Sequence, residues 1–131
     1  MVLSKSLQKS DDYSSEEAIA AAKRVLDNRQ DFLWHRPTEL ESQFNALGLF
    51  DFGDRLASLE TALDEITAQC RSGPQPPGDF SSGAYAGKRM YAFVWNSTEF
   101  GPVYIKFSFT GADRMASLVL HSFHKDTPKG S

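Results

Sequence analysis

Hydrophobic residues in the first half of the chain recur at the spacing of α-helices. One such stripe runs through residues 14–29, and another runs through residues 51–66 at steps of three and four. Between them, residues 38–48 carry Leu40, Phe44 and Leu47 and end at Gly48, a residue suited to the left-handed position that follows a helix. The pattern therefore predicts three amphipathic helices.

Local signals indicate where these helices begin. Ser14 and Glu17 have the spacing of a capping box, in which each side chain accepts a hydrogen bond from the other residue's backbone N–H. Thr38 is the expected cap of the second helix, and Asp51 or Gly53 opens the third. Residues 31–35 contain an apolar run too short for a helix, which predicts either a short strand or a buried connector.

The hydrophobic period changes from helical to two after residue 88. Alternating residues over 90–95 and 103–109, followed by a β-rich run over 118–123, predict three strands joined by polar, glycine-containing turns. We expect an α+β fold, with a three-stranded or slightly larger antiparallel C-terminal sheet and the N-terminal helices packed on one face. Residues 1–13 are expected to form a disordered tail, and residues 14–131 one domain with a helical part (14–71), a loop (72–87) and a sheet (88–125).

Composition indicates the cellular compartment in which this domain is found. A chain of 131 residues with 40% hydrophobic residues can bury one core. Cys70 is the only cysteine, which excludes an intrachain disulfide, and the sequence shows neither a signal peptide nor an apolar stretch long enough to cross a bilayer. We therefore expect a cytoplasmic protein without membrane contact.

The net charge of −3 is unevenly distributed. Residues 1–80 hold 8 Lys or Arg against 14 Asp or Glu, whereas residues 81–131 hold 6 against 3. The total charge disfavours broad electrostatic binding to nucleic acid, but a locally basic sheet could still meet a phosphate backbone.

Polar residues gather on one row of the predicted middle strand. Its apolar row belongs in the core, which leaves Tyr104, Lys106 and Ser108 on the other side. On the last strand, His124 shares a face with Ser122, and strict alternation turns His121 to the opposite, buried side.

The pairing of these two strands decides which side chains meet. If Tyr104 stands opposite Ser122, then Lys106 faces Leu120 and His124 lies one diagonal step from Tyr104. A slip by one residue would bring His121 into the place of His124.

The three residues Tyr104, Lys106 and His124 are the candidate catalytic groups. Metal-independent RNA cleavage needs a base for the ribose 2′-OH proton, an acid for the leaving oxygen and a cation for the phosphorane charge, and these residue types can supply all three. An ordinary solvated sheet face would carry the same residues, so that interpretation stays open. The sequence contains no zinc, phosphate-loop or hydrolase motif, and we expect neither a metal nor a cofactor.

Two C-terminal segments resemble a known family. Residues 101–109 (GPVYIKFSF) and 118–126 (LVLHSFHKD) are similar to the strand motifs of the MqsR family of bacterial toxins, and residues 47–52 (LGLFDF) resemble a further family element. This family belongs to the RelE-like endoribonucleases. The resemblance implies a RelE-like or MqsR-like fold and a ribosome-independent ribonuclease that cuts messenger RNA and is silenced by a cognate antitoxin protein.

The resemblance also implies roles for individual residues of this chain. Tyr104 falls on the family's functional tyrosine, and His124 stands where some members have a catalytic lysine. The family's further basic and amide positions lie near Arg71 and Trp95, although the residue pattern alone favours a core or edge role for Trp95 over base stacking. We add Lys88, Arg89 and Lys125 as candidate RNA contacts. The competing hypothesis is a non-enzymatic binding module, such as an antitoxin-like, immunity or ribosome-associated protein, that uses the same sheet.

Overall fold

The computed structural model describes residues 13–27, 32–34, 37–72, 90–110 and 117–126. The described elements are α1 (Ser15–Asp27), β1 (Phe32–Trp34), α2 (Pro37–Ala46), α3 (Phe52–Glu65), the short 3-10 helix η3 (Ala68–Cys70), β2 (Tyr91–Ser97), β3 (Gly101–Thr110) and β4 (Ser117–Lys125). The helices precede an antiparallel C-terminal meander, β2 to β4, along the chain, so the predicted α+β class is confirmed.

The described strands form one sheet in the order β1-β4-β3-β2. The predicted meander is confirmed, because β2 pairs antiparallel with β3 and β3 pairs antiparallel with β4. β1 extends the sheet by pairing in parallel with β4, from Phe32 opposite Leu118 to Trp34 opposite Leu120. Of the two interpretations of residues 31–35, the short strand is therefore the correct one for residues 32–34.

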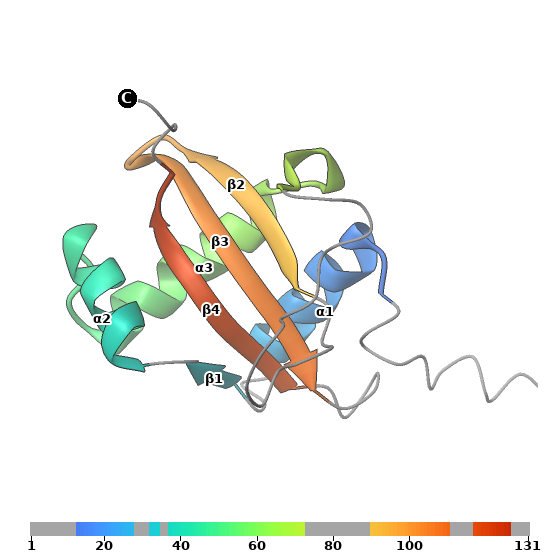
Figure 1. The fold of residues 1–131 in the computed structure, drawn as a ribbon, viewed down its shortest axis with the longest axis horizontal. Helices are drawn as coiled ribbons and strands as arrows, with labels where there is room; N and C mark the ends of the chain where they lie inside the picture. The colour runs from blue at the N-terminus through green and yellow to red at the C-terminus, as the bar shows by residue number, and fades with distance from the viewer. Residues whose placement is uncertain (1–12, 28–31, 35–36, 73–89, 111–116, 127–131) are drawn as a thin grey trace, which may run out of the picture.

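The helices cover one face of this sheet. In Figure 1, α1 and α3 cross behind the strands, and α2 lies beside β4. The alternating row Val103, Ile105, Phe107 and Phe109 is buried together with Leu59 and Leu63 of α3. Phe44 of α2 stacks on Phe123 of β4, with ring centroids 5.0 Å apart. The core thus lies between the helices and this row, which leaves the other row of β3 facing away from the helices.

The predicted helix ends are mostly confirmed. Ser14 N–H donates to Glu17 Oε1 at 2.9 Å, and Glu17 N–H donates to Ser14 Oγ at 3.1 Å, which completes the capping box. Asp51, rather than Gly53, caps α3 by accepting from Asp54 N–H at 2.8 Å. Thr38 does not cap α2: the helix begins at Pro37, whose fixed φ and missing N–H suit the first helical position.

Gly48 ends α2 as expected. Its φ is +81°, a left-handed value that a residue with a Cβ adopts only at a cost. Gly48 N–H donates to Asn45 O at 2.9 Å, and Leu49 N–H donates to Phe44 O at 3.0 Å, which is the Schellman pattern.

The predicted boundaries differ from the structure at Tyr13. This residue was placed in the tail, but it is buried, and its carbonyl accepts the Tyr91 hydroxyl at 2.9 Å. The prediction failed there because one apolar residue before a helix has no periodicity. Residues 1–12 and residues 73–87 of the predicted loop lie outside the described residues.

Candidate functional site

The structure places Tyr104 and His124 directly opposite each other on β3 and β4. Their ring centroids are 5.4 Å apart, with the ring planes tilted by 33°. The predicted register was wrong by two residues: Tyr104 does not face Ser122, and Lys106 faces Ser122 instead of Leu120. Because a shift of two preserves the face, the predicted meeting of phenol, ammonium and imidazole residues on one row still holds.

A β-bulge accounts for part of this difference. The pairing shifts between Lys106 and Phe107, so that His121 is an extra residue on β4. Phe107 pairs with Leu120, one residue from the predicted register, and beyond the bulge the offset becomes two. A bulge leaves no mark in the hydrophobic alternation of the opposite strand, which is why the sequence did not reveal it.

The bulge also changes where His121 points. His121 Nε2 lies 2.7 Å from Ser108 Oγ, and both residues are buried. The burial of His121 was predicted, but its side chain reaches the row of Ser108 rather than the opposite face. The expectation that Ser108 is exposed was wrong, since its side chain is fully buried. The partly exposed end of the row therefore begins at Lys106 and runs toward the β2–β3 turn.

A hydrogen bond to the backbone sets the tautomer of the His124 ring. Its Nδ1 lies 2.8 Å from the carbonyl oxygen of Lys125. A carbonyl can only accept, so Nδ1 carries a proton in this bond, and in the neutral ring Nε2 then has the free electron pair. His124 is half-buried, and Nε2 is the atom through which it could accept a proton.

Tyr104 is held in its neutral form. Burial, and then the negative charge of Asp126, raise the pKa of the Tyr104 hydroxyl above 10.0. A phenol is already protonated at neutral pH, so Tyr104 is a hydrogen-bond donor there, and burial together with the Asp126 charge disfavours its phenolate.

Asp126 is a site residue that sequence reasoning missed. Its N–H donates to Pro102 O at 2.9 Å, which continues the β3–β4 pairing by one step and puts Asp126 on the row of His124. The signal was available, because the period of two that links Ser122 and His124 reaches Asp126 next. We call Tyr104, Lys106, Ser122, His124 and Asp126 the open-face cluster.

The structure separates most of the predicted RNA contacts from the open-face cluster. The prediction for Trp95 was wrong: this side chain is buried at 4% exposure, and its Nε1–H donates to Glu65 Oε1 of α3 at 2.7 Å. Its row faces the helices, so its flat surfaces belong to the core.

Arg71 and Lys125 are exposed but point elsewhere. Arg71 forms a bridge with Phe93 beyond the outer edge of β2, and its guanidinium donates to Ala68 O at 3.2 Å. Lys125 pairs with Val103, which places it on the alternate row from His124. Lys88 and Arg89 lie outside the described residues.

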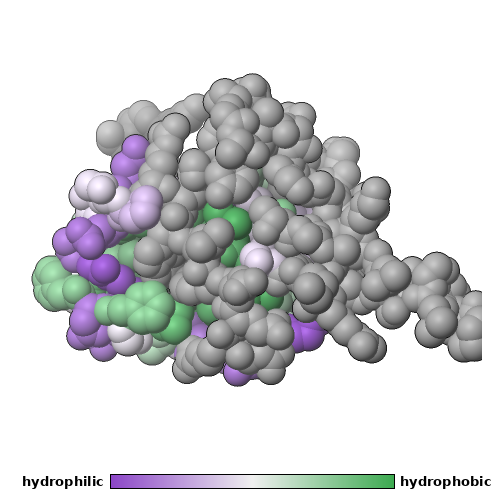
Figure 2. Space-filling view, turned by 90° about the horizontal axis from the view of Figure 1, so that it is seen from below, coloured by the Kyte–Doolittle hydropathy of each residue, from purple (hydrophilic) through white to green (hydrophobic). Residues whose placement is uncertain are grey.

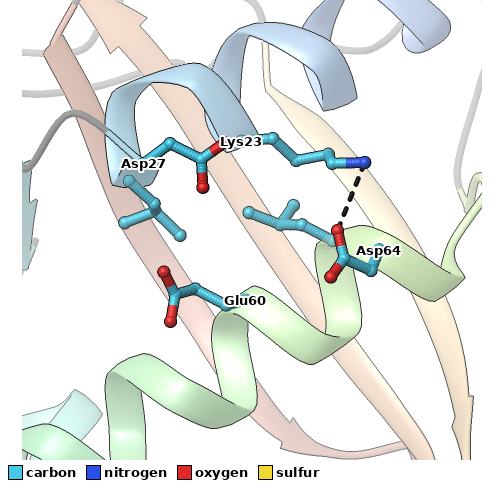
Figure 3. Close-up of a pocket in the computed structure, with 6 residues that line it drawn as sticks. Lys23, Asp27, Glu60 and Asp64 are labelled. Atoms are coloured by element: carbon cyan, nitrogen blue, oxygen red, sulfur yellow. Dashed lines mark ion pairs between the residues drawn. The ribbon is translucent and has the colours of Figure 1, made fainter.

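A hollow lies between α1 and α3, within the helix layer (Figure 3). It measures about 190 Å³ and is lined by Lys23, Leu26, Asp27, Glu60, Leu63 and Asp64. Lys23 Nζ pairs with Asp64 Oδ1 at 3.2 Å, and both side chains are largely exposed. With three carboxylates against one ammonium, this hollow would repel phosphate, and it belongs to the opposite face from the open-face cluster.

The described residues contain no group of three or more His, Cys, Asp or Glu arranged to hold a metal ion. No helix within the described ranges combines the length and apolarity needed to cross a bilayer. We compared the chain with protein-family models, with curated proteins and with solved structures, and none of these comparisons found a match. The resemblance to the MqsR family thus rests on the short sequence motifs alone.

Proposed function

We propose that this protein is a metal-independent, toxin-type endoribonuclease that cuts single-stranded messenger RNA and that a cognate antitoxin protein silences. The observation that supports this most strongly is the direct pairing of Tyr104 with His124. One residue has a nitrogen suited to accept a proton, and the other has a hydroxyl held protonated. Phosphodiester transfer by this route needs a general base and a general acid that can both reach the same phosphate.

In the proposed reaction, His124 Nε2 removes the proton of a ribose 2′-OH. The 2′-oxygen attacks phosphorus, the bond from phosphorus to the 5′-oxygen breaks, and Tyr104 donates its proton to that leaving oxygen. Lys106, two residues along β3 on the same row, offsets the negative charge that develops on the phosphorane. The products are a 2′,3′-cyclic phosphate and a 5′-hydroxyl, and the proton held by His124 returns to Tyr104 through solvent.

The test uses the purified chain with single-stranded RNA in EDTA, followed by mapping of the cut ends. We expect cyclic phosphate and 5′-hydroxyl ends, and we expect His124→Ala and Tyr104→Phe each to slow cleavage by about 10²-fold or more. Tyr104→Phe keeps the ring and removes only the hydroxyl. Lys106→Met should slow cleavage, because it removes the cation that offsets the phosphorane charge. Its matched control is Lys23→Met, which removes a cation from the helix layer and should leave cleavage unchanged. Full activity of the His124→Ala, Tyr104→Phe double variant would refute this assignment.

A binding module that uses the same face is the second candidate. Asp126 favours it, because a carboxylate beside Tyr104 opposes the approach of a phosphate. Expression in bacteria separates the two functions. A ribonuclease toxin should arrest growth and deplete transcripts in a manner that depends on His124, whereas a binding module should be tolerated.

A further inference from the structure

Two phenylalanines at the turn between α2 and α3 leave more than half of their surface exposed. Phe50 is 71% exposed and Phe52 is 53% exposed, and they are the exposed large hydrophobic residues among those described. In Figure 2, apolar side chains stand among hydrophilic ones at the left end of the molecule, where α2 lies in Figure 1. Large apolar side chains exposed together at one turn mark an interaction surface more often than a single scattered one does.

The backbone that carries this pair is held on both sides. Leu49, just before Phe50, donates its N–H to Phe44 O at 3.0 Å and accepts Arg55 Nε–H through its carbonyl at 2.9 Å. Asp51, which follows Phe50 and precedes Phe52 in the sequence, accepts a hydrogen bond from Asp54 N–H at 2.8 Å. The rings are therefore presented by an ordered turn, so a partner would lose little free energy in fixing it.

The segment of the chain that carries Phe50 and Phe52 is acidic. Residues 37–54 contain four carboxylates and no Lys or Arg, and all four are exposed: Glu39, Glu41, Asp51 and Asp54. The cations that flank this segment along the chain are Arg36, which lies outside the described residues, and Arg55, which is buried. An apolar pair within an acidic segment is complementary to a ligand that is both apolar and basic.

We propose that Phe50, Phe52, Asp51 and Asp54 form a docking surface for a basic, amphipathic segment of a partner protein. Apolar side chains of that segment cover the two rings, and its Lys or Arg side chains pair with the carboxylates. An anionic membrane fits poorly, because the carboxylates repel its head groups. A two-fold dimer fits poorly as well, because it would bring the same carboxylates face to face. The surface lies outside the open-face cluster, so it does not depend on the proposed ribonuclease activity.

The probe is a fluorescent synthetic helix of about 16 residues, roughly four turns, with Leu at helical spacing on one face and Lys on the other. Its matched control carries Glu in place of every Lys. Fluorescence anisotropy with the full chain should show binding of the basic peptide, weakening as salt rises, and no binding of the acidic one. The double variant Phe50→Ser, Phe52→Ser should weaken binding about tenfold or more.

Charge variants distinguish binding of the basic peptide at this surface from nonspecific electrostatic attraction to the protein. Asp51→Asn keeps a good helix cap, and together with Asp54→Asn it should reduce both the affinity and its salt dependence. Asp64→Asn removes an exposed carboxylate from the hollow between α1 and α3, so it should change nothing. Equal weakening by Asp64→Asn, unchanged binding by the phenylalanine variant, or binding of the acidic peptide would each overturn the proposal.

Two further measurements test other occupants of this surface. Sedimentation of the chain alone over a range of concentrations tests for a dimer formed through this surface. Any self-association that is seen should persist in the Phe50→Ser, Phe52→Ser variant. Vesicles of phosphatidylcholine and phosphatidylglycerol should not retain the protein through these rings. Either effect would assign the surface to a second copy or to a membrane and would refute a basic protein partner.

Discussion

Arg55 offers the sharpest test of how the α2–α3 turn is held. Its guanidinium is buried, donates to Leu49 O at 2.9 Å and to Asn45 Oδ1 at 2.8 Å, and lies over the Phe44 ring at 5.5 Å from its centroid. Arg55→Met retains a long apolar side chain of similar reach and removes the charge with both hydrogen bonds. The variant therefore isolates the polar role of this residue.

The expected loss follows from the three contacts. The Leu49 carbonyl would lose its buried donor, at a cost of about 1–3 kcal/mol. Loss of the cation over Phe44 adds about 0.5–2 kcal/mol. Asn45 is exposed, so water replaces its partner at little cost. The sum is about 1.5–5 kcal/mol of unfolding free energy, which for a domain of this size lowers Tm by an amount on the order of 10 °C.

Urea unfolding followed by circular dichroism measures this loss. Asn45→Ala is the matched control, because it removes only the bond to Asn45, a part-buried bond that water can reach, and should cost less than Arg55→Met. The reasoning fails if Arg55→Met unfolds at the wild-type urea concentration, or if Asn45→Ala costs as much as Arg55→Met.

The remaining predictions concern Tyr104 and two glycines. Because the folded state raises the pKa of Tyr104, the native protein keeps this proton while an unfolded tyrosine loses it, so stability should fall as pH rises above 10.0. Asp126→Asn should lower that pKa, seen as earlier phenolate absorbance in an alkaline titration, and an unchanged titration would contradict the role of Asp126. Gly48→Ala should cost about 1 kcal/mol in urea unfolding, because φ is +81° there while nothing lies within 4 Å of an added Cβ. Gly53→Ala, in the first turn of α3 with no positive φ, should instead stabilise by up to about 1 kcal/mol.

Local chemistry was sufficient for the elements of this fold. The capping box at Ser14, the turn at Gly48 and the cap at Asp51 involve residues a few positions apart, so their spacing in the sequence determines their contacts. The alternation over residues 103–109 likewise assigned the buried row of β3 correctly. Tyr104 and His124 could be proposed together for the same reason, since alternation assigns each strand residue to a face before any register is known.

Contacts between distant segments decided the rest. The bulge at His121 set the final register and brought this histidine to Ser108, although strict alternation predicted the opposite face. Trp95 became a core residue because α3 supplies Glu65 as the acceptor for its N–H. Whether an aromatic residue on a strand faces solvent or a helix depends on where that helix packs, and periodicity within one strand carries no such information. The sequence predicted that Tyr104 and His124 could share a row, and the packing of β4 and α3 determined which residues meet.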